Sequence, residues 1–255
     1  GSLAAAAIDK LVATGKDGQF TTIDELINQR LLQVYQQADG RPDRHVALQA
    51  AIDTMSTLAP RHYGATVAAR IRLAQQLDQQ GQSAEAGAML QTVARQVEND
   101  PASAGYLADI GKARVWFLLQ HQQPTQAEAL LASPPYAPLR HDAHDGLALD
   151  HAWVLLALGK TEEGLRQMRF AAYSQRNQPN LSQRLYGAKL RKPSLLYPAD
   201  LAYALNQAGH KTEAHQILAT LEGYECISDD EQSYLWGQVR SKALRKLTEG
   251  VCPQS

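Results

Sequence analysis

Four segments of this chain share one pattern, and this internal repetition constrains the fold more than any other feature. Each segment has a helical run, a tight polar turn, and a second helical run that opens on small residues. The turns fall at Gly81, around Gln122 to Pro124, at Gly159 and at Gly209. One such hairpin cannot bury its apolar side alone, so several must stack to form a core. The pattern predicts an all-α chain of antiparallel helix pairs.

Local chemistry around the turns supports this prediction. Glycine adopts the left-handed conformation that often ends a helix, without a clash at Cβ. Hydroxyl residues follow each turn, where an N-cap side chain would open the next helix. These expected caps are Ser83, Thr125, Thr161 and Thr212. A small residue follows five positions after each turn, as a close crossing of two helices requires. These small residues are Ala86, Ala127, Gly164 and Ala214.

The four turn-and-helix pieces read GQSAEAGAML, QPTQAEALL, GKTEEGLRQM and GHKTEAHQIL. Over residues 70–221, this series resembles the tetratricopeptide repeat. The resemblance implies a right-handed α-solenoid, a tetratricopeptide-like superhelix with a concave groove. The spacing departs from the family, because the small residues are separated by 41, 37 and 50 positions, whereas a regular array repeats about every 34 residues.

The flanking regions also predict helices. Apolar residues recur along one face of 23–37, and a second helix is expected over 44–58, burying Val46, Leu48, Ala51, Ile52 and Met55. We therefore expect an N-terminal hairpin region over 3–64, repeats over 65–222, and a capping helix with a tail over 223–255. The last region contains Cys226 and Cys252, on either side of a predicted helix over 228–249. The ends of that helix lie roughly 30 Å apart, so the cysteines can pair only if it breaks or one cysteine folds back.

An insertion at about 177–197 breaks the repeat spacing, and in solenoids insertions map to loops that often lie on the binding face. Its cations are Arg184, Lys189, Arg191 and Lys192. The segment is either a basic loop that contacts an acidic partner or an ordinary charged surface excursion.

The family resemblance implies that the first helix of each hairpin lines the groove. The projected groove stripe consists of Arg72, Gln75, Asp78, Lys112, Trp116, Leu149, Trp153, Tyr203 and Asn206. Aromatic side chains on such a stripe would suit an extended peptide, since they give a large contact area at low entropy cost. The alternative places Trp116 and Trp153 in the core, because a shift of one residue turns the stripe by about 100°.

The densest polar cluster lies at 140–151 and includes His141, His144, Asp145 and His151. Two histidines one helical turn apart can bind a transition metal, and Asp145 could add an oxygen ligand. On one continuous helix, however, His151 would lie too far along to join them. The cluster is either a metal-dependent catalytic centre or a solvent-facing polar loop. The sequence contains no phosphate-binding glycine loop, HExxH, GxSxG or CxxC motif.

Composition narrows the function further. Lys and Arg total 25 and Asp and Glu total 26, a net charge of -1, whereas nucleic-acid binders usually present a net basic surface. The sequence contains no run of 18 or more apolar residues, so it predicts no membrane span. Gly1 and Ser2 resemble a residue pair left by tag removal, which leaves open whether a signal peptide, an anchor or an upstream domain was cut away.

We therefore expect a non-enzymatic scaffold without a cofactor, an adaptor or assembly factor in a bacterial multiprotein system that binds a peptide or partner protein. Three alternatives remain: the effector-binding part of a larger bacterial regulator, a metal-dependent enzyme that uses His141 and His144, and nucleic-acid binding through the basic insertion and the cations at 240–246. The sequence leaves the compartment, cytoplasmic or periplasmic, open.

Overall fold

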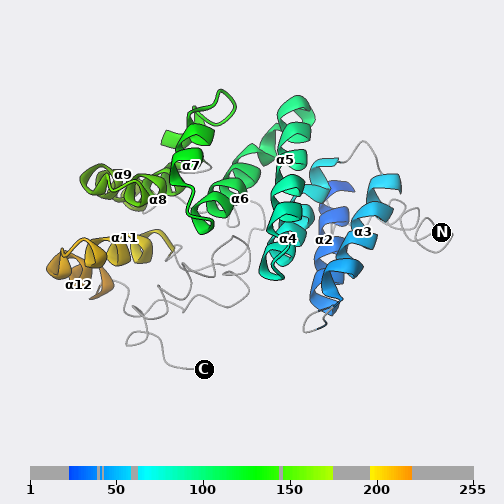
Figure 1. Ribbon diagram of the computed structural model, residues 1–255, viewed down its shortest axis with the longest axis horizontal. Helices are drawn as coiled ribbons and strands as arrows, with labels where there is room; N and C mark the ends of the chain where they lie inside the picture. Colours follow the sequence, from blue (N-terminus) through cyan, green and yellow to red (C-terminus); the bar gives the residue numbers. More distant parts are fainter. Residues whose placement is uncertain are drawn as a thin grey trace. The chain divides into compact units, whose positions relative to one another are not determined.

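The computed structural model describes residues 23–38, 41, 43–58, 63–143, 146–174 and 196–219. Within these ranges the chain forms ten α-helices, three short 3-10 helices and no strand (Figure 1). The prediction of an all-α chain is confirmed there. No helix in these ranges has both the length and the hydropathy needed to cross a bilayer. The predicted insertion, both cysteines and the predicted C-terminal helix lie outside the described residues.

The chain divides into two compact units, 1–110 and 111–255. Unit 1 contains α2 (Ile23–Gln37), α3 (Arg44–Leu58), η2 (Tyr63–Thr66), α4 (Val67–Gln79), α5 (Ser83–Asn99) and η3 (Pro101–Tyr106). The division falls within α6 (Leu107–Gln120). Unit 2 then contains α7 (Pro124–Ala132), η4 (Leu139–His141), α8 (Ala148–Ala157), α9 (Thr161–Ser174), α11 (Leu196–Gln207) and α12 (Lys211–Ala219).

The first hairpin of unit 1 has the predicted bounds, and its two helices pack against each other. On α3, Leu48, Ile52 and Met55 are buried at the spacing of one helical face. The prediction that Val46 is buried was wrong, since 56% of it is exposed. Val46 lies two positions before Leu48, which places its side chain on nearly the opposite side of the helix.

The predicted turns are confirmed at all four positions. Gly81, Gly159 and Gly209 have φ values of 83°, 76° and 88°, in the left-handed region. Gln122 occupies the same place between α6 and α7 with φ at 57°. The backbone geometry of this turn is therefore repeated even where the sequence supplies no glycine.

The predicted N-caps were wrong. Ser83 and Thr161 are the first residues of α5 and α9, while Thr125 and Thr212 are the second residues of α7 and α12. Gln82 and Gln123 occupy the N-cap positions of α5 and α7, and neither makes a side-chain capping hydrogen bond. The helices begin earlier because a single residue separates each left-handed residue from the first residue of the next helix.

The small residues expected at the helix crossings are all buried: Ala86, Ala127, Gly164 and Ala214. The crossing of α8 and α9 is the tightest case. A Cβ added to Gly164 would lie 2.8 Å from Cγ of Leu156 and 3.1 Å from the carbonyl oxygen of Ala152. Close approach of these two helices therefore requires glycine at this position.

The core of unit 2 runs through two successive hairpins, α8 with α9 and α11 with α12 (Figure 1). Helix α11 also packs against α9, so the first helix of one hairpin contacts the second helix of the hairpin before it. Leu149 and Leu165 from the first pair share one apolar cluster with Leu201 and Leu205 from the second. This continuous core positions α8 and α11 for the site described next.

Candidate functional site

Aromatic side chains occupy equivalent positions in three successive hairpins of unit 2. Counting back six residues from each left-handed turn residue gives Trp116 on α6, Trp153 on α8 and Tyr203 on α11. The ring centroids of Trp116 and Trp153 lie 6.0 Å apart, with an angle of 62° between the planes. Those of Trp153 and Tyr203 lie 5.9 Å apart at 40°. We call these three residues the aromatic ladder.

The Trp116 end of the ladder is buried. Trp116 is 8% exposed, and its indole Nε1 donates a hydrogen bond of 2.7 Å to Oδ1 of Asp150 on α8. Asp150 is itself 5% exposed, so this bond is made away from water and couples two hairpins. Burial of Trp116 agrees with the core alternative rather than with a groove-facing ring.

The other two rings, Trp153 and Tyr203, are only half-buried. Although the Trp153 ring reaches the surface, its Nε1 is shielded from water and has no hydrogen-bond partner. Asp200 lies three residues before Tyr203, as Asp150 lies three residues before Trp153, and is also buried. The ladder therefore passes from a satisfied, buried tryptophan to two rings that border on solvent.

The remaining residues of the predicted stripe have mixed surroundings. Lys112 and Asn206 of unit 2 and Asp78 of unit 1 are half-buried, whereas Leu149 belongs to the core of unit 2. In unit 1, Arg72 and Gln75 are buried on α4, with exposures of 4% and 6%. The guanidinium carbon of Arg72 lies 5.7 Å from the centroid of the Tyr35 ring. Within unit 2, the ring contacts join the three aromatic members of the stripe, and Trp153 also packs against the cluster that contains Leu149.

The histidine cluster differs from its predicted arrangement. His141 ends η4 and His151 lies on α8, so no continuous helix joins them, yet their ring centroids are 5.7 Å apart. The prediction that His151 is too distant to join this cluster was therefore wrong. The backbone N–H of Leu147 donates to the carbonyl oxygen of Leu139 at 2.8 Å, which brings the start of α8 back to η4. Gly146 permits this close approach, because a Cβ there would collide with Cβ of Asp142.

His151 is the buried member of the cluster, with 5% exposure, and its Nε2 lies 3.4 Å from Oε2 of Glu128 on α7. Burial lowers the pKa of His151 below its ordinary value of 6.5, and the nearby Glu128 carboxylate opposes that shift. Arg140 and His141 lower the pKa further through charge repulsion. Arg140 also donates a 3.0 Å hydrogen bond from Nε to Nε2 of His141. These contacts make His151 a neutral, buried histidine.

Two of the predicted metal-ligating residues, His144 and Asp145, lie outside the described residues, as do Arg184, Lys189, Arg191 and Lys192. In the part of the chain that the structure describes, no group of three His, Cys, Asp or Glu side chains could hold a metal ion.

Comparisons with known proteins identify no relative of this chain. No family model matches the sequence, no curated protein is similar to it, and no solved structure matches it. The tetratricopeptide-like assignment therefore stays a prediction from the sequence.

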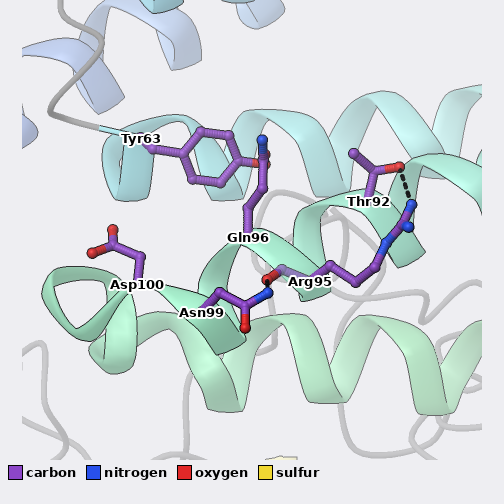
Figure 2. Close-up of a pocket in the computed structure, with 6 residues that line it drawn as sticks. All are labelled: Tyr63, Thr92, Arg95, Gln96, Asn99 and Asp100. Carbon is purple, nitrogen blue, oxygen red and sulfur yellow. Dashed lines mark hydrogen bonds between the residues drawn. The ribbon is translucent and has the colours of Figure 1, made fainter.

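A second feature, which the sequence did not indicate, is a hollow of about 580 Å³ on unit 1. Figure 2 shows its lining, which is Tyr63 from η2, the α5 residues Thr92, Arg95, Gln96 and Asn99, and Asp100 at the end of α5. The α5 residues follow the spacing of one helical face, but a polar helical face normally indicates only contact with solvent. Tyr63 comes from another element, and no local signal in the sequence connects it with α5.

Proposed function

We propose that this protein is a non-enzymatic helical-repeat scaffold that binds an extended peptide segment of a partner protein. In this proposal the hairpins form a right-handed, tetratricopeptide-like superhelix, in which the first helices of the hairpins face the partner. The packing of α11 against α9 supports stacking, since each unit of such an array contacts only its neighbours. A bacterial adaptor or assembly factor is the setting that we favour.

The observation that carries the proposal is the aromatic ladder. Three equivalent helices place aromatic rings in one continuous row, and the rings of Trp153 and Tyr203 border on solvent. Aromatic rings provide large, rigid contact areas and predominate among residues that dominate binding energy. Asn206 follows Tyr203 by three residues, on the same side of α11. Its amide adds a donor and an acceptor, the groups that an extended peptide backbone needs.

The test is selection of peptides from a random displayed library on the immobilised protein, followed by affinity measurement with fluorescently labelled peptides. We expect Tyr203→Ala to weaken binding of the selected peptides by about tenfold or more, which corresponds to loss of an interface residue worth about 1.4 kcal/mol. Asn206→Ala should weaken the same peptides to a smaller extent.

Phe170 provides the matched control, because it is an aromatic residue on α9 that is 49% exposed and lies outside the ladder. Phe170→Ala should leave peptide affinity unchanged, and circular dichroism should show that each variant keeps its helices. If no peptide is enriched, or if Phe170→Ala weakens the selected peptides as much as Tyr203→Ala does, the ladder is not the binding surface.

A further inference from the structure

The hollow on unit 1 contains some polar groups that are already engaged. The Thr92 hydroxyl donates to the carbonyl oxygen of Ala88 at 2.9 Å. Figure 2 shows the bond that Nδ2 of Asn99 donates to the carbonyl oxygen of Arg95, at 2.7 Å. Oδ2 of Asp100 accepts a 2.6 Å hydrogen bond from the Ser103 hydroxyl. These bonds fix the orientation of three side chains that line the hollow, those of Thr92, Asn99 and Asp100.

The Tyr63 hydroxyl, in contrast, is shielded from water and has no hydrogen-bond partner. The Tyr63 ring packs against Arg70, whose guanidinium carbon lies 5.0 Å from the ring centroid. Arg70 is in turn fixed by bonds to the hydroxyls of Thr66 and Ser56, at 3.1 and 2.9 Å. Burial raises the pKa of Tyr63, so the hydroxyl keeps its proton and remains a donor at neutral pH.

Arg95 is the cation of the hollow. Its guanidinium makes a single long contact, 3.5 Å from Nη2 to the Thr92 hydroxyl, and no carboxylate of the described residues pairs with it. A guanidinium presents several donors in a planar fork that matches the two oxygens of a carboxylate. Figure 2 shows that Arg95 and Asp100 extend toward opposite ends of the hollow, so the site is cationic at one end and anionic at the other.

We propose that this hollow is a binding site for a small polar molecule that bears a carboxylate. The carboxylate pairs with the Arg95 guanidinium and, by displacing the side chains that shield the Tyr63 hydroxyl, accepts a hydrogen bond from it, while the Asp100 end faces donor groups of the ligand. A volume of about 580 Å³ lies within the range of small-molecule sites, about 300–1,000 Å³. A phosphate suits the site less well, because it would bring two negative charges beside one arginine and near Asp100. This site is independent of the aromatic ladder, which lies in unit 2.

Titration of the isotopically labelled protein, followed by amide and arginine side-chain NMR signals, tests the proposal with four probes at constant ionic strength. Glutamate and 5-aminopentanoate carry a carboxylate and an ammonium group, 1,5-diaminopentane carries only ammonium groups, and inorganic phosphate is the competing anion. We expect glutamate and 5-aminopentanoate to shift the Arg95 Nε–H signal saturably in the millimolar range. The diamine should not shift it, and phosphate should bind more weakly. Absence of a saturable shift with both carboxylates, or tighter binding of phosphate, would overturn the proposal.

Three variants complete the test. Arg95→Gln should lower glutamate affinity by about tenfold, since a charge-assisted pair is lost. Tyr63→Phe should lower it by several-fold without destabilising the fold, because it removes a buried hydroxyl that has no partner. Arg166→Gln is the control, an exposed arginine on α9 whose loss should leave glutamate affinity unchanged. Retained affinity in Arg95→Gln would show that the hollow does not bind the probe.

Discussion

Two tryptophans at equivalent positions allow the contribution of one buried hydrogen bond to be measured. The Trp116 indole donates to the buried Asp150 carboxylate at 2.7 Å, whereas the Trp153 Nε1 is shielded from water and has no partner. A hydrogen bond to a charged group contributes about 1.5–3 kcal/mol to stability. Substitution by phenylalanine removes the N–H in both cases. We therefore expect Trp116→Phe to lower the free energy of unfolding by about 2 kcal/mol more than Trp153→Phe does.

Urea denaturation followed by far-UV circular dichroism measures both losses, provided that the dependence of the free energy on urea stays the same among the variants. Trp116 is the more buried ring, so packing also contributes to its loss. A double-mutant cycle with Asp150→Ala separates the two effects. The coupling between Trp116→Phe and Asp150→Ala should be about 1.5–3 kcal/mol, while the same cycle with Trp153→Phe should give a coupling close to zero.

The reasoning fails if Trp153→Phe costs as much as Trp116→Phe, or if the two cycles give equal couplings. Either result would mean that packing of the rings, and not the bond to Asp150, joins α6 to α8. The urea experiment would then give no reason to treat Trp116 as a structural residue and Trp153 as a ligand-binding one.

Three further predictions concern stability. Gly164→Ala should lower the free energy of unfolding by about 1–2 kcal/mol, because overpacking against Leu156 outweighs the gain in helix propensity; thermal denaturation would show it. Gln122→Gly should raise it by about 0.5–1 kcal/mol and Gly159→Ala should lower it by a similar amount, because both residues have left-handed backbones. Because burial depresses the pKa of His151, the unfolded state binds its proton more readily, so stability should fall as pH drops below about 6.5; His151→Gln should flatten that dependence in urea titrations at successive pH values.

The parts of the fold that could be predicted from the sequence are those that depend on local chemistry. A turn position with a left-handed backbone favours glycine, because other residues are strained there. Gly81, Gly159 and Gly209 therefore identified three turns directly. Polar residues before Pro124 identified the fourth, where Gln122 accepts the strain. The small crossing residues followed from the same periodicity. Helix starts were less predictable, because a difference of one or two residues in where a turn ends changes which residue is the N-cap.

The candidate site was less predictable because its contacts join distant parts of the chain. The equivalent positions of Trp116 and Trp153 were visible in the sequence, but burial of Trp116 depends on Asp150, which lies 34 residues further on. His141 and His151 likewise meet because they lie on two separate elements, η4 and α8, and not on the one helix that was predicted. Helical periodicity assigns a residue to a face, but it does not identify which residue covers that face.

Both proposed sites contain a buried donor without a hydrogen-bond partner, as does Gln75 Nε2 on α4 elsewhere in the described core. A buried N–H or O–H without an acceptor destabilises a fold by about 1–3 kcal/mol, and such groups in native proteins call for an explanation. Trp116 has its acceptor in Asp150 and is buried, as a structural residue should be. Trp153 and Tyr63 each hold a desolvated donor without a partner, and both rings are only half-buried. A ligand that displaces the side chains shielding these donors can supply the acceptor and offset the cost, which is why we assign one ligand to each.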